Sequence, residues 1–300
     1  MKAIGQYESV AACVSACFGS EVKIEGKNFV GGGDINESRC LLLSNGARVF
    51  VKENTLSNYG FFEAEEYGLG LIAETQAIRT PKLLGRGLDR SFGTSFLMME
   101  MIEPAPRAEG FWEEFGRELA KMHSADTKPL LSEGRFGLDR DNYIGAGKQI
   151  NTPKDTWVDF FRECRLAVQL HRAERYFDQS LLRLAERLLE RLEDRLIEPE
   201  QPALLHGDLW SGNFITGSDG KAWLIDPAVY IGHPEADLAM TELFGRFHPS
   251  FYQSYHEVKP LQAGYEERRD LYNLYHLLNH LNLFGASYLS SVSGIIRRYA

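Results

Sequence analysis

The order of apolar and polar positions divides the chain into two parts. Up to about residue 101, short apolar stretches alternate with turn-forming residues, which is typical of strands. After Pro104 and Pro106, apolar residues recur every three or four positions over long stretches, which predicts helices. We therefore expect an α+β fold with two lobes, an N-terminal lobe over residues 1–101 and a C-terminal lobe over residues 102–300.

The first part is expected to form a small antiparallel sheet with one main helix. Asn45-Gly46 favours a two-residue turn, which would join the apolar stretches on either side into a hairpin. A glycine run that begins at Gly31 lies between this hairpin and the apolar pair Phe29-Val30. Helices are predicted over residues 7–18 and 61–75, and further strands over residues 80–87 and 95–101.

The second part has a helical pattern with one interruption over residues 203–226. Within it, two short apolar stretches flank the turn residues 217–220 and predict a second hairpin. Asn213 comes directly before the first of these strands, and Asp226 comes soon after the second. Because a hairpin brings its two ends together, we expect an amide oxygen and a carboxylate side by side. Helices are predicted over residues 112–122, 157–171, 181–196 and 271–285.

Residues near this second hairpin carry groups suited to phosphoryl transfer. Carboxylate and amide oxygens are hard ligands that suit Mg²⁺, so Asn213 and Asp226 are candidate magnesium ligands. Asp208 lies five residues before Asn213. That spacing matches the phosphoryl-transfer loop in which the acid accepts a hydroxyl proton and the asparagine holds the metal. Asp208 is therefore the candidate catalytic base.

The first part supplies candidate nucleotide-binding residues. Lys52 alternates with Val51 on its predicted strand, where an ammonium group can reach nucleotide phosphates, and Glu65 in the following helix is a candidate partner for it. Glycines let backbone N–H groups approach phosphates without a clash at Cβ. The candidates in the glycine run are Gly31, Gly32 and Gly33.

The apolar stretch over residues 95–101 leads to the junction of the two lobes. In folds of this kind the adenine ring binds the backbone there, which makes Met99, Glu100 and Met101 candidate nucleotide contacts. Each feature by itself is weak evidence for nucleotide binding, because glycine runs and lysines at strand ends are common. Their order along the chain predicts an enzyme that uses ATP and Mg²⁺.

Composition narrows the class of partners. The formal net charge is −9 and the pI is about 5.5, which argues against a nucleic-acid binder and mildly favours cationic substrates. No stretch reaches 18 apolar residues, and the N-terminus lacks the pattern of a secretory signal. We expect a cytoplasmic monomer that does not bind membranes, with its four cysteines reduced.

The chain resembles the fructosamine kinase family (ketosamine-3-kinases), within the aminoglycoside-phosphotransferase-like branch of the protein-kinase fold. The segment LLHGDLWSGN is similar to that family's catalytic loop, and DPAVYIGHPEADLAM is similar to its metal-binding segment. DNYIG, WVDFFRECRLAVQL and YHLLNHLNLFG also resemble family segments, so the resemblance covers nearly the whole chain. It implies a bilobal, protein-kinase-like fold.

The resemblance also implies an activity, the ATP-dependent phosphorylation of the 3-hydroxyl of ketosamines, which are sugars attached to amines by glycation. The phosphorylated adduct is unstable and releases the amine, so the substrates would be small ketosamines or glycated proteins. Carried over by position, Asp208 would be the catalytic base, and Asn213 and Asp226 would hold Mg²⁺. Lys52 would bind the α- and β-phosphates of ATP, and Glu65 would orient it.

Two features depart from related sequences. Some family members carry a cysteine in the glycine loop that acts as a redox switch, whereas Asp34 follows the glycines here, so no such switch is expected. The Asp-Phe-Gly of protein kinases is replaced by Asp226-Pro227-Ala228. Proline biases the residue before it toward an extended backbone, and no phenylalanine is available to flip. We therefore predict a permanently assembled metal site without activation-loop control.

Four further residues have a structural and a functional interpretation. Trp210 either contacts the substrate or fills the gap beneath the loop. His206 is expected to pack and to hydrogen-bond the loop backbone rather than to move protons. Asp237 is expected to anchor the catalytic loop from a nearby helix, and Trp157 is expected to belong to the core.

Two other functions remain open on the sequence. A different small-molecule kinase of the same fold would act on an amino alcohol or an aminoglycoside. A pseudokinase would bind nucleotides without transferring phosphate, although the joint presence of Lys52, Asp208, Asn213 and Asp226 argues against it. Ribulosamines, erythrulosamines and fructosamines are all candidate ketosamine substrates.

Overall fold

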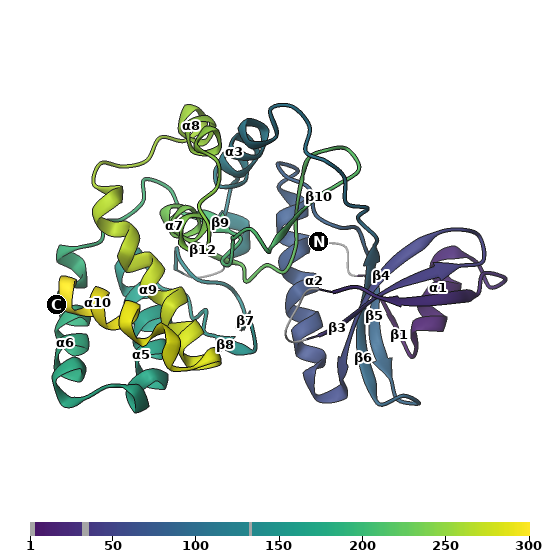
Figure 1. The fold of residues 1–300 in the computed structure, drawn as a ribbon, viewed down its shortest axis with the longest axis horizontal. Helices are drawn as coiled ribbons and strands as arrows, with labels where there is room; N and C mark the ends of the chain where they lie inside the picture. The colour runs from purple at the N-terminus through teal and green to yellow at the C-terminus, as the bar shows by residue number, and fades with distance from the viewer. Residues whose placement is uncertain (1–3, 32–35, 132–133) are drawn as a thin grey trace. The chain divides into compact units, whose positions relative to one another are not determined.

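The computed structural model describes residues 4–31, 36–131 and 134–300. Its contacts form two compact units, one made of the chain up to Phe111 together with Phe214–Asp226, and the other of Trp112–Asn213 together with Pro227–Ala300. The first unit contains the main sheet and the second is mainly helical (Figure 1). This is the α+β, protein-kinase-like fold that was predicted.

A six-stranded sheet forms the framework of the first unit, in the order β1-β5-β6-β4-β3-β2. Its strands are β1 (Gly5–Tyr7), β2 (Ile24–Phe29), β3 (Glu37–Leu43), β4 (Arg48–Thr55), β5 (Leu83–Asp89) and β6 (Thr94–Glu100). Neighbouring strands run antiparallel except β1, which pairs with β5 in parallel. The prediction of a wholly antiparallel sheet is wrong at this edge, because a strand of three residues is too short to show an alternating pattern.

Two helices, α1 (Val10–Phe18) and α2 (Tyr59–Glu74), pack on opposite faces of this sheet (Figure 1). Successive side chains of a strand point to opposite faces. Val49 and Val51 of β4 therefore pack in the cluster that includes α1, while Lys52 reaches a residue of α2. The alternation places the lysine beside the helix that was predicted to hold its partner.

Two local predictions are corrected by the structure. Helix α1 begins at Val10 rather than at residue 7, because Ser9 caps it by accepting a backbone N–H of the first turn at 3.1 Å. The turn between β3 and β4 has three residues rather than two, since the Leu43 N–H bonds the Ala47 carbonyl at 2.9 Å. Gly46 ends this turn with a φ of 81°, a left-handed conformation that glycine adopts readily.

The predicted second hairpin is present in the first unit, as β10 (Phe214–Thr216) and β11 (Ala222–Leu224). The two strands pair antiparallel, with the first residue of β10 opposite the last residue of β11. Asn213 directly precedes this pair of strands, and Asp226 follows it by two residues. The pattern of short apolar stretches was therefore sufficient to locate the hairpin.

Helices make up most of the second unit. They are α3 (Phe111–Met122), α4 (Trp157–Phe160), α5 (Ala167–Ala173), α6 (Gln179–Glu190), α7 (Glu235–Leu243), α8 (Pro249–Val258), α9 (Tyr265–Phe284) and α10 (Leu289–Tyr299). A π-helical stretch, Phe161–Leu166, joins α4 to α5, so the helix predicted over residues 157–171 changes its winding along its length. Helix α9 belongs to the core of this unit, with Leu271, Leu274 and Leu278 fully buried.

Two short strand pairs complete the second unit. They are β7 (Asn142–Ile144) with β8 (Gly147–Gln149), and β9 (Ala203–Leu205) with β12 (Tyr230–Gly232). Strand β9 leads directly into the predicted catalytic loop, and β12 follows residues 227–229. The pairing of β9 with β12 therefore brings these two stretches of chain together within the unit.

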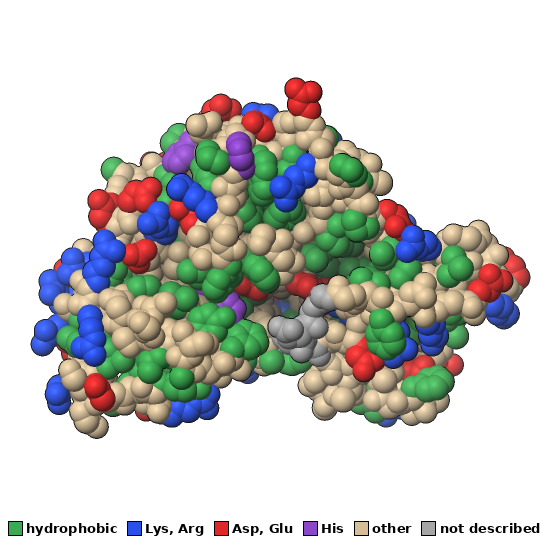
Figure 2. Space-filling view, viewed as in Figure 1, with side chains coloured by type: hydrophobic (Ala, Val, Ile, Leu, Met, Phe, Trp, Pro, Cys, Tyr) green, Lys and Arg blue, Asp and Glu red, His purple; other side chains and the backbone are tan. Residues whose placement is uncertain are grey.

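The surface carries charges of both signs. Lys and Arg side chains are interspersed with Asp and Glu side chains on the face seen in Figure 2. Across residues 4–31, 36–131 and 134–300, no helix combines the length and the apolar character that crossing a membrane requires.

Candidate active site

Lys52, Glu65 and Asp226 form an ionic cluster in the first unit. The Lys52 ammonium pairs with the Glu65 carboxylate at 2.6 Å and also with the Asp226 carboxylate. Three elements supply these groups, because β4 carries the lysine, α2 the glutamate, and the segment after β11 the aspartate. The predicted ion pair between Lys52 and Glu65 is therefore present, and Asp226 joins it as a third member.

Burial and charge together set the protonation states in this cluster. Burial alone would lower the pKa of Lys52, but the carboxylates of Asp226 and Glu65 raise that pKa above its ordinary value, so the ammonium stays charged. Burial raises the pKa of Glu65 to about 7, because the charge of Lys52 offsets only part of the desolvation. The Asp226 side chain is 39% exposed, so it is the member of the cluster that a ligand can reach.

The backbone at Asp226 differs from the prediction. An extended conformation was expected, but the structure has a left-handed one, with a φ of 53°. The following proline disfavours the right-handed helical region, and the chain turns here as it leaves the hairpin instead of continuing straight. Aspartate tolerates the left-handed region better than most residues, at a cost of roughly 1–3 kcal/mol.

Asp208 and Asn213 lie together in the second unit. The Asn213 side-chain amide donates to the Asp208 backbone carbonyl at 2.7 Å and to the Asp208 carboxylate at 3.0 Å. These bonds use the amide nitrogen, which leaves the amide oxygen as the atom that Asn213 can offer to a metal. The Asp208 side chain is 23% exposed, so a hydroxyl group can approach it.

Asp237 of α7 fixes the segment that leads to Asp208. Its carboxylate accepts the backbone N–H groups of His206 at 2.7 Å and Gly207 at 2.8 Å, and it contacts the His123 ring at 3.2 Å. Burial would raise the pKa of Asp237, but these hydrogen bonds and the nearby histidines lower it below its ordinary value. The expectation that Asp237 anchors the catalytic loop is confirmed.

Gly207 lets the catalytic loop turn tightly. It has a φ of 81°, and a side-chain carbon at this position would lie 2.0 Å from the Ala228 carbonyl oxygen. The Ala228 N–H in turn bonds the His206 carbonyl at 2.8 Å. His206 is fully buried, and its ring accepts the Asp208 N–H at 3.3 Å, which confirms that it supports the loop backbone.

One residue beside Asp208 was missed by the sequence analysis. His276 of α9 places its Nδ1 atom 3.9 Å from the Asp208 carboxylate. Burial lowers the pKa of His276 to about 3, so its ring is neutral near pH 7 and does not form a charged pair with Asp208. The only signal for it was its place in a segment that resembles the family.

Trp210 and Trp157 have different surroundings. Trp210 is 36% exposed and packs edge-on against Phe244, with ring centroids 6.1 Å apart. An indole that filled the gap beneath the loop would be buried, so Trp210 stays a candidate for contact with the substrate. Trp157 is fully buried and belongs to the core, as predicted.

The predicted hinge residues lie at the end of the sheet. Met99 and Glu100 are the last residues of β6, and Met101 follows where the chain leaves the strand. Met99 is buried in the cluster that includes α2, and the Glu100 N–H bonds the Lys82 carbonyl at 2.9 Å. This hydrogen bond and the burial of Met99 hold the backbone of the segment that was predicted to contact adenine.

The glycine run is described only in part. Gly31 is exposed and follows β2, and a side-chain carbon built there would meet open space. Gly32, Gly33 and Asp34 lie outside the described residues.

Asn213 in the second unit and Asp226 in the first unit each carry an oxygen of a kind that Mg²⁺ accepts. Mg²⁺ is usually held by one or two carboxylates or amides together with phosphate oxygens and waters. Asn213 offers an amide oxygen and Asp226 a partly exposed carboxylate. Within the part of the chain that the structure describes, no three His, Cys, Asp or Glu side chains gather into a group that could hold a metal by themselves.

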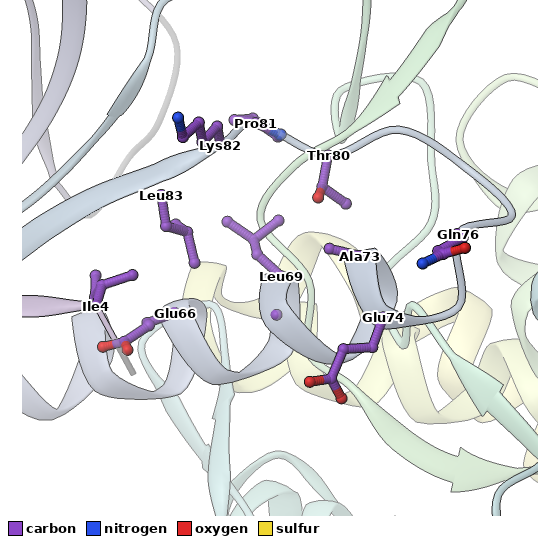
Figure 3. A pocket seen from close by; sticks show the side chains of 11 residues that line it. Ile4, Glu66, Leu69, Ala73, Glu74, Gln76, Thr80, Pro81, Lys82 and Leu83 are labelled. Carbon is purple, nitrogen blue, oxygen red and sulfur yellow. The ribbon is translucent and has the colours of Figure 1, made fainter. Parts of the chain in front are cut away.

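A separate open pocket of about 500 Å³ lies beside α2 in the first unit (Figure 3). Leu69, Ala73 and Leu83 line it together with Glu66 and Glu74. None of the predicted site residues lines this pocket, so it is distinct from the ionic cluster.

The fold and the site define a class, the protein-kinase-like phosphotransferases. One unit carries a buried lysine–glutamate pair with a third carboxylate, and the other carries an acid and an asparagine five residues apart on a fixed loop. The model of the fructosamine kinase family matches residues 6–300. The chain belongs to the fructosamine kinase family.

Individual relatives are similar over nearly the whole chain. A protein named "Probable ketoamine kinase" from Synechocystis sp. is 39% identical over 296 residues, which cover 97% of this chain and 96% of that protein. The chloroplastic protein-ribulosamine 3-kinase of Oryza sativa subsp. indica is 42% identical over 284 residues, covering 94% of this chain and 80% of that protein. The crystal structure of "Putative fructosamine-3-kinase" from Haemophilus somnus has a TM-score of 0.85 at 30% identity, covering 97% of this chain and 96% of that one. The resemblance found in the sequence is confirmed.

Proposed function

We propose that this protein is an ATP-dependent ketosamine 3-kinase, which transfers the γ-phosphate of ATP to the 3-hydroxyl of a sugar attached to an amine. The observation that carries this proposal is the ionic cluster of Lys52, Glu65 and Asp226. It occurs in a chain whose relatives, named ketoamine kinase and ribulosamine 3-kinase, match nearly its whole length. The phosphorylated sugar then releases its amine, so the reaction reverses glycation.

The nucleotide is bound mainly by the first unit. Lys52 exchanges its contact with Asp226 for the α- and β-phosphates, and Glu65 keeps the ammonium in place. The backbone at residues 99–101 receives the adenine, and the glycines at 31–33 approach the phosphates. Asn213 and Asp226 hold Mg²⁺, which when bound supplies positive charge against the β- and γ-phosphates.

The acceptor is handled by the catalytic loop. Asp208 orients the sugar hydroxyl and accepts its proton as the new O–P bond forms. Because the transition state of phosphoryl transfer is loose, positioning matters more than the strength of the base. Asn213 fixes the carboxylate through its hydrogen bond, and the ring of His276 beside it is neutral.

The exposed indole of Trp210 gives the acceptor side a flat apolar surface two residues after Asp208. A sugar ring or the apolar stem of an amine carrier can pack on such a surface. Both small ketosamines and glycated lysines on proteins fit this description. We propose that the enzyme acts on them as a cytoplasmic monomer.

The test is a kinetic comparison of a ribulosamine and a fructosamine of lysine, with choline, homoserine and an aminoglycoside as control acceptors. ADP and sugar phosphate should form in equal amounts with at least one ketosamine, with a kcat/KM at least about a hundredfold above that of the controls. Tight ATP binding without transfer to any ketosamine would indicate a pseudokinase. Transfer to a control acceptor alone would indicate another kinase of this fold.

A further inference from the structure

The hairpin β10–β11, which leads to Asp226, is held along both of its edges by other segments of the first unit. On the β11 edge, the Leu224 N–H bonds the Arg79 carbonyl at 2.8 Å. On the β10 edge, the Ala105 N–H bonds the Thr216 carbonyl at 3.0 Å. The hairpin is therefore fastened between two segments that come much earlier in the chain.

Arg79 holds this hairpin at two points. Its backbone pairs with Trp223 and Leu224 of β11, and its guanidinium pairs with the Asp219 carboxylate in the turn at 2.8 Å. Asp219 is itself fixed, because it accepts the Trp223 indole N–H at 3.1 Å and the Lys221 N–H at 3.1 Å. Because β11 is attached at both of its ends, the hairpin resists both rotation about a single attachment point and displacement along the strand direction.

The attachment of β11 to Arg79 lies close to Asp226, the candidate metal ligand. Only Ile225 separates Leu224 from Asp226, and one residue spans at most about 3.6 Å. A shift of β11 is therefore passed on to the Asp226 carboxylate. Lys52, in contrast, is fixed in the middle of the sheet, on a strand paired on both sides. The contact between Lys52 and Asp226 thus depends on where the hairpin is held.

The loop that carries Arg79 continues directly from α2, and Figure 3 shows it between Gln76 and Thr80. Gln76 has a φ of 54°, which turns the chain sharply at the end of the helix. The same helix carries Glu65. One continuous segment, α2 with the loop after it, therefore positions both carboxylates that surround Lys52. It carries Glu65 itself, and it acts on Asp226 indirectly through Arg79.

We propose that Arg79 is a positioning residue for Asp226: through Asp219 and β11 it sets the place of the Asp226 carboxylate, and thereby the affinity for metal-bound nucleotide. This inference rests on the proposed function, in which Asp226 holds the metal. The Arg79 and Asp219 side chains are 29% and 35% exposed, and ion pairs at such positions contribute little to folding. The pair therefore acts on position and not on stability.

The test replaces Arg79 by methionine, which keeps the apolar stem and removes the guanidinium. Binding of a non-hydrolysable ATP analogue is measured by calorimetry in Mg²⁺ and in EDTA. We expect Arg79→Met to lose roughly tenfold in Mg²⁺-dependent affinity, because a small misplacement of a ligand group has a large effect. Binding in EDTA, the KM for ketosamine and the midpoint of thermal unfolding should not change, and Arg79→Lys should restore most of the loss.

Arg48 supplies a matched control. It pairs with Glu103 at 2.8 Å in the same unit, with side chains that are 46% and 47% exposed. This pair does not involve the hairpin. Arg48→Met should therefore bind the Mg²⁺-loaded analogue as the unmodified protein does.

The outcomes separate this inference from the proposed function. If Asp226→Asn loses Mg²⁺-dependent binding and Arg79→Met does not, the role of Arg79 is wrong and the proposed function stands. If Asp226→Asn keeps that binding, the metal is held elsewhere, and both the role of Arg79 and the proposed role of Asp226 as a metal ligand are wrong. Equal losses in Arg79→Met and Arg48→Met would reveal a general effect of surface charge, which also overturns the role of Arg79.

Discussion

At the scale of single residues, two carboxylates differ because their surroundings differ. Asp208 is partly exposed and is oriented by a hydrogen bond from Asn213. Glu65 is buried and shares the ammonium of Lys52 with Asp226. The first is therefore suited to meeting a substrate, and the second to holding a charge in place.

The role of Asp208 is tested by a change that keeps the size of the side chain. Asp208→Asn removes the proton acceptor and should lower kcat by about 10²–10⁴-fold. The KM for ATP should change little, because the contacts proposed for the nucleotide lie mainly in the first unit. Steady-state kinetics with a ketosamine measure both constants, and near-normal turnover would mean that Asp208 is not the base.

The burial of Glu65 predicts a dependence of stability on pH. Its pKa is raised from 4.5 to about 7 in the folded protein, so between these values the folded state keeps a proton that the unfolded state has lost. The contribution of Glu65 to the free energy of unfolding should therefore fall by about 3 kcal/mol as the pH rises through this range. Urea unfolding of the unmodified protein and of Glu65→Gln at several pH values measures this difference.

Glu63→Gln is the control for that measurement, because Glu63 lies on the same helix with its side chain 51% exposed. Its unfolding curves should follow those of the unmodified protein at each pH. A difference between the unmodified protein and Glu65→Gln that stays constant from pH 4.5 to 7 would contradict the assigned shift.

At the scale of elements, the loop that carries Asp208 is held by a helix that is distant in sequence. Asp237 of α7 binds the backbone at His206 and Gly207, and the glycine permits the close approach of Ala228. The hairpin β10–β11 is held in a comparable way by the loop after α2. In both cases a segment takes its position from an ionised or main-chain partner that is distant in the sequence.

Removing the charge of Asp237 should therefore disturb both folding and catalysis. Asp237→Asn places an amide where two backbone N–H groups need an acceptor, and it should lower the free energy of unfolding by about 2–4 kcal/mol. We also expect kcat to fall, because the loop then presents Asp208 less precisely in space. Urea unfolding and kinetics on the same sample measure the two effects, with the exposed Asp194→Asn as a control. Unchanged unfolding in Asp237→Asn would show that the loop does not depend on this anchor.

The parts of this arrangement that the sequence predicted are those that depend on local pattern. The alternation along β4 and the helix after it were enough to pair Lys52 with Glu65, and short apolar stretches were enough to find the second hairpin. His276 was missed because its approach to Asp208 depends on the packing of α9, which no local pattern records.

Other differences have equally physical reasons. The backbone of Asp226 was predicted wrongly because the proline rule describes a local preference, whereas the exit from a paired hairpin imposes a turn. Strand β1 was not predicted, and its last residue, Tyr7, was assigned to the helix over residues 7–18, because its partner β5 lies far along the chain. Helices α8 and α10 were not predicted at all, although they complete the second unit.

At the scale of the whole molecule, the residues of the proposed site are divided between two units. Lys52, Glu65 and Asp226 belong to one, and Asp208 and Asn213 belong to the other. Neither set is sufficient for phosphoryl transfer, which requires a held nucleotide and an oriented hydroxyl. The proposed function therefore requires both sets to act on one phosphoryl group.

This division predicts which variants respond to nucleotide. A non-hydrolysable ATP analogue with Mg²⁺, at about 100 times its dissociation constant, should stabilise the unmodified protein by about 2.7 kcal/mol and raise its unfolding midpoint by several degrees. Asp208→Asn should show a similar rise, and Asp226→Asn a much smaller one. Thermal unfolding followed by fluorescence measures all three. A loss of the response in Asp208→Asn alone would contradict the division.

The most direct test of the proposed site is a crystal structure of the protein with Mg²⁺, a non-hydrolysable ATP analogue and a ketosamine. The metal should lie about 2.0–2.1 Å from the Asn213 amide oxygen and from the Asp226 carboxylate. The 3-hydroxyl of the sugar should lie within about 2.6–3.2 Å of the Asp208 carboxylate. A metal bound by other residues, or a sugar whose 3-hydroxyl is out of reach of Asp208, would contradict the proposed mechanism.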